Sequence, residues 1–357
     1  MKACRRSLRS CHSGPQDAPG ALQVANTLVP IGALWWAIAA TAGVSPLLSG
    51  ALALAIGLLL VRAFVLMHDC GHRSLFRSRR LNRWCGVLLG VLAGIAQPVW
   101  SRNHDHHHVT NGDWERYRGP LAVIPVHEYI ALTRGRQWRF RVLRSIWLSP
   151  LAGLLYFVVW PRLNCLRATA SLLRHVLRGG VPRGVPALAA RLRSYARPYC
   201  GSAADCGHML VNNIALLAAW GAMAWALGAV LFFSCYLLAM AVAGAVAIVL
   251  FAVQHNFARS YASATAGWDR DRAVMDGTSF LVLPAWLNWV TADIAYHHVH
   301  HLCSGIPNYR LAACHRHAQQ RFATVARVRL GEVAGAVRYI LWDTDLQRLV
   351  SVAELAG

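Results

Sequence analysis

Ten of the 17 histidines lie in three short segments whose spacing suits metal binding. These segments are residues 68–72 (HDCGH), 104–108 (HDHHH) and 297–301 (HHVHH). Residues i, i+3 and i+4 share one face of a helix, so each segment can direct two or three imidazoles at one point. Eight such imidazoles exceed the four ligands of a usual zinc site. They predict two transition-metal ions, with iron, copper or zinc favoured over magnesium or calcium.

The apolar stretches near these segments are long enough to cross a membrane. Of the 357 residues, 56% are hydrophobic and only 14% are charged, against about 25% charged in ordinary soluble proteins. Residues 23–61 and 209–251 contain no Asp, Glu, Lys or Arg. Each run is about twice the ~20 residues of one spanning helix, so each predicts a helical hairpin. The turns are predicted near residues 43–46 and 226–228, where Gly and Pro interrupt the helices.

Two hairpins predict an all-α integral membrane protein with four transmembrane helices and a cytosolic helical cap. Residues 84–101 are expected to be interfacial or re-entrant, because a crossing there would separate the first two histidine segments. Residues 145–160 are shorter and contain Pro150, and we expect them to be interfacial as well. The region from Arg310 is expected to be amphipathic helix, and no segment alternates like a strand.

This arrangement divides the chain into five expected parts. They are a basic cytosolic tail (1–22), the first hairpin (23–62), a cytosolic and interfacial region with two histidine segments (63–208), the second hairpin (209–252) and a cytosolic region with the third segment (253–357).

The formal charge of +21 comes from arginines in the loops that flank the apolar runs, while the two hairpin turns carry no charge. Positive loops mark the cytoplasmic side of a membrane. Both termini and all three histidine segments are therefore expected in the cytoplasm. We expect a multi-pass protein of a bacterial inner membrane whose first helix is not cleaved. Anionic lipid headgroups suit these arginines better than nucleic acid does.

The ten cysteines form no C-x2-C pair, and most lie in segments expected to be cytosolic or within the membrane. Disulfides are rare in such places, so we expect the cysteines to be reduced and buried. Cys70 lies inside the first histidine segment and is expected to fill space rather than to bind metal.

Three kinds of site compete for the histidines. His68 and His72, with Asp69 between them, resemble the H-E-x-x-H motif of zinc proteases, but Asp is one methylene shorter than the Glu and most of the histidines would be idle. A metal transporter would place its site near the middle of the membrane, whereas these segments lie just outside the apolar runs. A two-metal oxidative site at the membrane surface uses all three segments.

Further motifs around the segments make this last interpretation specific. They are QHNF at 254–257 with Trp268, DGTSF at 276–280, LP at 283–284, Trp289, DIAYHHVHHL at 293–302, IPNYRL at 306–311, VHEY at 126–129 and LWD at 341–343. Together with the three segments, which look like histidine boxes, they resemble the membrane fatty acid desaturase family, and its acyl-lipid branch in particular. The resemblance covers roughly residues 25–350.

The resemblance implies which histidines bind metal. By position the ligands are His68, His72, His104, His107, His108, His255, His297, His300 and His301. His106 and His298 would point away from the metals. The remaining histidines, at positions 12, 127, 175, 208, 315 and 317, are expected to have structural or surface roles. Asp69 and Asp105 are candidates to hydrogen-bond histidine ligands. Asp293 is a third candidate, and it stands where related proteins tend to carry Asn.

The chemistry that the resemblance implies is O2-dependent removal of hydrogen from two adjacent methylenes of an acyl chain, with two Fe ions as cofactors and water as the other product. An apolar tunnel between the hairpins would hold the acyl lipid. A hydroxylase or another lipid-modifying oxygenase on the same scaffold is the alternative enzyme. Electrons must come from a separate ferredoxin or cytochrome b-type protein, because the chain has no His-Pro-Gly-Gly, no Rossmann glycine motif and no iron–sulfur cysteine spacing. The basic face could bind an acidic donor of this kind.

Overall fold

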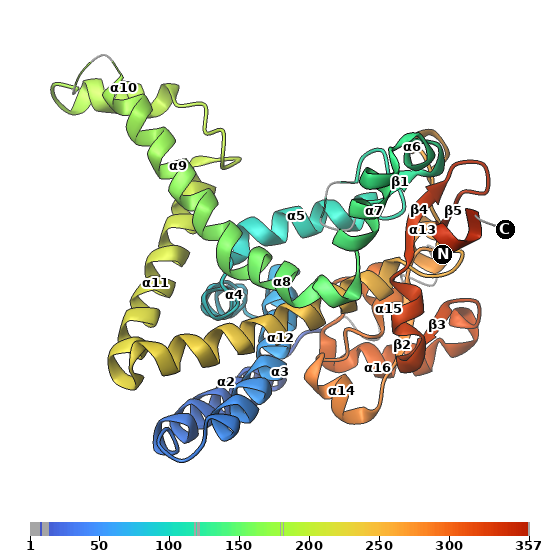
Figure 1. Ribbon diagram of the computed structural model, residues 1–357, viewed down its shortest axis with the longest axis horizontal. Helices are drawn as coiled ribbons and strands as arrows, with labels where there is room; N and C mark the ends of the chain where they lie inside the picture. Colours follow the sequence, from blue (N-terminus) through green and yellow to red (C-terminus); the bar gives the residue numbers. More distant parts are fainter. Residues whose placement is uncertain are drawn as a thin grey trace.

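The computed structural model describes residue 8 and residues 14–117, 119, 122–178, 180 and 182–355, and these are mostly helical (Figure 1). The long helices are α2 (Asp17–Ala40), α3 (Pro46–Gly71), α4 (Arg79–Leu92), α5 (Gln97–Thr110), α9 (Trp160–Leu177), α11 (Ala203–Leu227) and α12 (Ala229–His255). The shorter helices are α6 (Val126–Ala131), α7 (Arg134–Leu143), α8 (Ser149–Leu154), α10 (Val185–Ser194), α13 (Arg270–Met275), α14 (Ala285–Val290), α15 (His297–Leu302), α16 (Asn308–His317) and α17 (Val333–Ala336).

Both predicted hairpins are present. The first turns between α2 and α3, where the Ser45 side chain accepts a hydrogen bond from the amide of Leu47 and Pro46 begins the next helix, a favourable place for proline. The second turns at Gly228, whose φ of 82° is in the left-handed region. Helix α2 begins at Asp17 rather than near residue 23, so the N-terminal tail is shorter than expected. The arginines at positions 5, 6 and 9, and His12, lie outside the described residues.

Five helical segments of the described chain are long and apolar enough to span a membrane, or six if α4 and α5 count as one bent span. Helices α4 and α5 meet at an angle of 99°, as expected for a broken or re-entrant segment. The expectation of a short segment at 145–160 is wrong. It belongs to a candidate span of 32 residues, Ile146–Leu177, which runs through α8, a π-helical turn (Leu155–Val159) and α9.

Helix α3 is the centre of the fold and packs against α2, α4 and α12. The largest core cluster consists mainly of apolar residues of α3 and α12, such as Ile56, Leu66 and Met240. Helix α8 approaches α12 very closely, because a Cβ on Gly153 would lie 2.5 Å from the main chain of Gly244. Small residues of this kind allow helix backbones to touch.

Five short strands correct the all-helical prediction. β1 (Ile124–Pro125), β4 (Tyr339–Asp343) and β5 (Arg348–Ser351) form one sheet, and β2 (Ser279–Val282) pairs in parallel with β3 (Ala326–Arg329) in another. The prediction of amphipathic helix from Arg310 onward is therefore wrong beyond α16. In Figure 1 these strands lie beside α13, α15 and α16, at the opposite end of the molecule from α10.

A disulfide joins Cys200 to Cys206, just before and inside α11. The expectation that the cysteines are reduced is wrong for this pair. Cys70 is a free, buried thiol.

Candidate metal centre

Four separate elements bring nine histidines to one place. They lie at the C-terminal ends of α3 and α12, on α5 and on α15. Histidines at i and i+4 lie about one helical turn apart, so the local spacing in each segment orients its rings together. All nine imidazoles are buried or partly buried.

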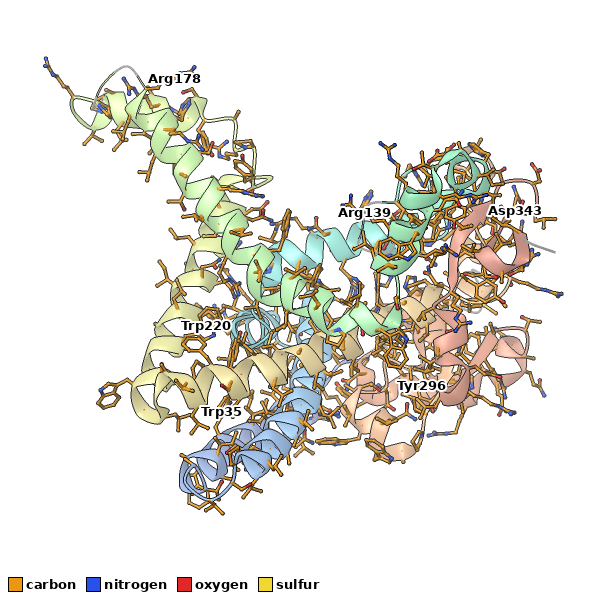
Figure 2. The ribbon with its side chains drawn as sticks, viewed as in Figure 1. Trp35, Arg139, Arg178, Trp220, Tyr296 and Asp343 are labelled. Atoms are coloured by element: carbon orange, nitrogen blue, oxygen red, sulfur yellow. A yellow bond between two sulfur atoms is a disulfide. The ribbon has the colours of Figure 1, made fainter. Side chains whose placement is uncertain are left out.

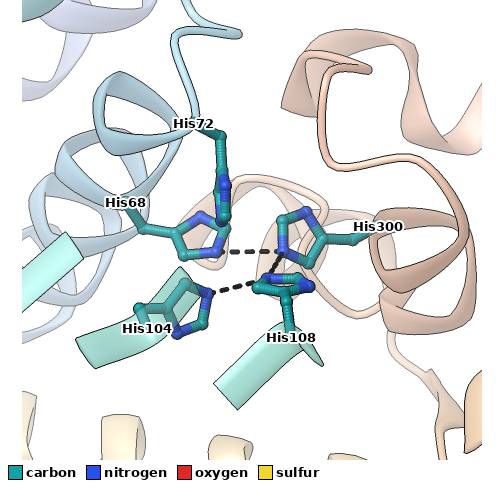
Figure 3. Close-up of side chains that lie close together, drawn as sticks. All are labelled: His68, His72, His104, His108 and His300. Carbon is teal, nitrogen blue, oxygen red and sulfur yellow. Dashed lines mark hydrogen bonds between the residues drawn. The ribbon is translucent and has the colours of Figure 1, made fainter. Parts of the chain in front are cut away.

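The histidines form two groups, and within each group the ring nitrogens lie within 4.8 Å of one another. The first group, shown in Figure 3, is His68, His72, His104, His108 and His300. The second group is His107, His255, His297 and His301. Helices α5 and α15 each contribute to both groups, so the two groups share their supporting elements.

The contacts between rings suit a cation in each group. The Nε2 atom of His300 lies 3.1 Å from that of His68 and 3.0 Å from that of His108. The Nε2 atom of His255 lies 3.1 Å from that of His107 and 2.9 Å from that of His297. Two nitrogens bound at right angles to one ion at ~2.1 Å would be about 3 Å apart. Because a ring nitrogen can donate or accept only once, hydrogen bonds alone satisfy this convergence poorly.

Neighbouring groups orient several of these rings. His68 Nδ1 lies 3.1 Å from a carboxylate oxygen of Asp69, whose other oxygen accepts from the amide of Asn308 at 2.9 Å. His72 Nδ1 lies 3.6 Å from Asp105, which is 62% exposed. His255 Nδ1 contacts the carbonyl of Gly277 at 3.1 Å. The contacts of His68 and His255 are within hydrogen-bond distance, and contacts of this kind fix the tautomer of a histidine ligand, whereas 3.6 Å is too long for a hydrogen bond between His72 and Asp105.

His106 and His298 are outside both groups. His106 is exposed and its Nε2 lies 3.3 Å from the carbonyl of Arg116. His298 is fully buried, and its Nε2 contacts Nδ1 of His315 at 2.8 Å beside Phe280 and Phe322. Asp293 belongs to neither group of metal-capable residues.

The protonation states of the histidine side chains on α15 suit metal binding. Burial lowers the pKa of His297, His300 and His301 well below the usual range, and neighbouring histidines lower it further. The imidazoles therefore stay neutral at physiological pH, as ligands must. Burial and the neighbouring His315 lower the pKa of His298 to about 3.

Trp100 is a site residue that sequence reasoning missed. Its ring stacks on His104, with centroids 4.7 Å apart and planes 12° from parallel. Its Nε1 donates to the hydroxyl of Tyr156 at 3.2 Å. The i, i+4 spacing of Trp100 and His104 could have identified this contact.

An apolar cavity of about 550 Å³ adjoins both histidine groups. It is lined at the metal centre by His68, His104, His107 and His297. Away from the metal centre its walls include Val61, Phe64, Tyr156, Phe157 and Leu250. A hollow with mostly apolar walls that ends on metal-capable groups suits an extended apolar ligand.

Comparison with known proteins agrees with this geometry. The family profile described as "Fatty acid desaturase" matches residues 43–330. The chain belongs to the fatty acid desaturase family. It is 30% identical over 339 residues to a fatty acid desaturase of Bacillus subtilis (strain 168), which covers 94% of this chain and 87% of that protein. Membership makes the chain an oxidoreductase and confirms the family suggested by the histidine segments.

Two further desaturases match over shorter regions. A delta(8)-fatty-acid desaturase of Borago officinalis is 29% identical over 136 residues, 36% of this chain and 30% of that protein. An sn-1 acyl-lipid omega-3 desaturase (ferredoxin) of Synechocystis sp. (strain ATCC 27184 / PCC 6803 / Kazusa) is 37% identical over 57 residues, 16% of each chain.

Proposed function

We propose that this protein is an O2-dependent, di-iron desaturase that introduces a double bond into an acyl chain carried by a membrane lipid. The observation that carries the proposal is that both histidine groups line the same apolar cavity. The first group would hold one iron and the second group the other. Iron bound there would supply, with O2 and external electrons, the oxidising power to remove hydrogen from two adjacent methylenes.

The residues of the chain provide position and exclusion of water. Phe64, Phe157 and Leu250 enclose the cavity, so an acyl chain inside it is separated from water. At the metal-facing end, the stacked Trp100 limits the orientation of His104. Small displacements of a reacting carbon cost rate, so these contacts decide which methylenes react.

The surface near α7 supports a lipid-bound substrate. Helix α7 has no buried residue, and Trp138 and Leu143 are more than half exposed. Five arginines lie between residues 134 and 144 with no acidic residue among them, and Figure 2 shows one of them, Arg139, on this helix. Exposed tryptophan and arginine together are typical of a membrane interface. Leu143 also lines the cavity, so the cavity opens beside this helix.

Arg144 is placed to bind the polar end of the lipid. It lines the cavity, its Nη2 donates to the carbonyl of Ala122 at 2.8 Å, and its guanidinium lies 3.7 Å from the centre of the Phe140 ring. Burial lowers the pKa of Arg144 to about 10, so it stays charged at neutral pH. A cation at the mouth of an apolar cavity suits the phosphate of a phospholipid whose acyl chain extends inward.

Electrons would come from a small separate protein. The Synechocystis relative is named as a ferredoxin-dependent enzyme, and the charge of +21 favours binding of an acidic donor. We place the protein in a bacterial inner membrane with its histidine groups on the cytoplasmic side, in agreement with the candidate spans and the arginine-rich loops.

Expression of the chain in cells followed by lipid mass spectrometry tests the proposal. We expect new monounsaturated or polyunsaturated phospholipids with the wild type and none with His300→Ala, which should still insert into the membrane. Products that gain oxygen instead of losing hydrogen would identify a hydroxylase. Unchanged lipids together with readily exchanged metal would indicate a transporter.

A further inference from the structure

Arg62 is a charged residue within helix α3, a candidate membrane span. It is 1% exposed, and a charge in a membrane span is costly unless it has a function. Its guanidinium contacts two elements. Towards α2, Nε donates to the hydroxyl of Thr27 at 3.1 Å, and Nη2 donates to the side chains of Gln23 and Asn26. Towards α14, Nη1 donates to the main-chain carbonyl of Trp289.

The carbonyl of Trp289 belongs to a strained turn that leads directly into the histidines of α15. Ala292 and Asp293 have φ angles of 45° and 56°, in the left-handed region. That region is unfavourable for residues other than glycine, so surrounding contacts must hold the turn in place. On its other side, Nε2 of Gln254 donates to the carbonyl of Ile294 at 2.9 Å.

Both contacts come from helices that themselves carry histidines of the metal centre. Arg62 precedes His68 on α3 by six residues, and Gln254 immediately precedes His255 on α12. The turn before α15 is thereby fixed to α3 at one end and to α12 at the other. Because His297 begins α15 four residues after Asp293, a shift of this turn would move the ligands of both groups.

We infer that Arg62 and Gln254 are positioning residues that hold the third histidine segment in register with the other two. The inference rests on the proposed metal centre, since its purpose is to fix the ligands. Asp293 supplies negative charge near Arg62 and opposes the cost of its burial.

The bend before the second histidine segment is held in a similar way. Arg162 of α9 donates to the carbonyl of Gly94, between α4 and α5, and to the carbonyl of Phe157 at 3.2 Å. Gly94 also has a left-handed φ, of 76°. The Nε atom of Arg162 donates to the side-chain oxygen of Asn213 at 2.7 Å. An arginine within a candidate span thus binds a main-chain carbonyl at the turn before each of these two segments.

The test is iron binding by the full-length purified protein. Arg62→Gln removes the charge and the reach to the Trp289 carbonyl, and Gln254→Leu removes the second contact. We expect each to weaken Fe(II) binding at least tenfold, within the range seen for groups that support metal ligands. In Arg62→Gln, which does not alter the lining of the cavity, the value of kcat should fall while KM for the lipid stays the same. Gln23→Ala is the matched control, because it removes a contact of the same guanidinium on the α2 side only.

Wild-type iron affinity in Arg62→Gln would overturn the inference, and so would an equal loss in Gln23→Ala, which would mean that Arg62 only packs α2 against α3. If Arg62→Gln does not fold, Arg62→Lys decides: its shorter, single donor group should give a folded protein with weaker iron binding, and unchanged binding would refute the inference. A wild type that binds iron but leaves lipids unchanged would refute the proposed function alone. A wild type that binds no metal would refute both.

Discussion

Replacement of Phe157 by alanine should lengthen the acyl chain that the cavity accepts. Phe157 is 4% exposed, and its ring meets that of Phe64 edge to face with centroids 5.2 Å apart. These two rings and Ala247 line the main cavity and also a second, small hollow, which is otherwise lined by Leu60, Ala93, Met240 and Ala243. The aromatic pair therefore forms a partition between the two spaces.

The size of the effect follows from burial of methylene groups. Removal of a buried phenyl ring costs about 3–5 kcal/mol of folding stability. A substrate two methylenes longer can fill the opened space and gains about 0.8 kcal/mol for each methylene. The ratio of kcat/KM for the longer over the shorter substrate should then rise about fifteenfold, since ~1.6 kcal/mol corresponds to that factor. Phe157→Leu should give a smaller change in the same direction.

The assay is competition between two lipids that differ by two methylenes, with products separated by mass spectrometry. Phe232→Ala is the control, because Phe232 is 2% exposed on α12 but lines neither space. It should lose similar stability without a change in chain-length preference. An unchanged product ratio in Phe157→Ala, or the same shift in Phe232→Ala, would show that the aromatic pair does not limit the chain.

Three further results are expected. His107→Ala and His300→Ala should each lose bound iron and turnover, whereas His106→Ala should keep both; full activity in either of the first two contradicts the ligand assignment. Arg144→Gln should raise KM roughly tenfold for a phospholipid but not for an uncharged diacylglycerol, and equal effects on both would refute phosphate binding. Since His298 has a pKa of about 3 when folded and about 6.5 when unfolded, the unfolded state takes up its proton first. His298 should therefore contribute a loss of stability of about 1.4 kcal/mol per pH unit as the pH falls from 6.5 to about 3. In His298→Gln, the free energy of unfolding, measured by denaturant titration at several pH values, should depend less steeply on pH. An equal pH dependence in the variant and the wild type would contradict this.

Local signals in the sequence correctly predicted the two helical hairpins. They also correctly predicted that histidines within one segment come together on one face of a helix. Pro46 and Gly228 mark the two turns because their backbone preferences act without help from distant residues. The periodicity of helical histidines acts over one turn and also needs no tertiary information. These parts of the fold were therefore predictable.

Other features depend on residues far apart in the chain and were not predictable. β2 and β3 pair in parallel although Ser279 and Ala326 are 47 positions apart, so neither strand shows a complete signal of its own. The carbonyl of Gly277 that contacts His255 and the turn held by Arg62 are main-chain contacts, which carry no signature in residue type. The disulfide depends on a close approach of Cys200 and Cys206 that composition does not reveal.

The meeting of the histidine segments also limits how the chain can cross a membrane. Segments that share one metal centre must lie on one side, so an even number of crossings must separate them. Between His108 and His255 there are three candidate spans, Ile146–Leu177, α11 and α12, and one of them cannot cross. Helices α11 and α12 form a hairpin closed at Gly228, so we propose that Ile146–Leu177 is the segment that does not cross.

That segment contains three arginines, which suits a helix at the membrane surface. A reporter fused at Gly180 should therefore lie on the same side as one fused after His317. The disulfide between Cys200 and Cys206 favours the other answer, because disulfides persist in oxidising compartments outside the cytoplasm. Opposite sides for the two reporters would show that Ile146–Leu177 crosses, and α11 or α12 would then have to lie in the interface. The same side would place this cysteine pair in the cytoplasm, where reducing conditions oppose the disulfide.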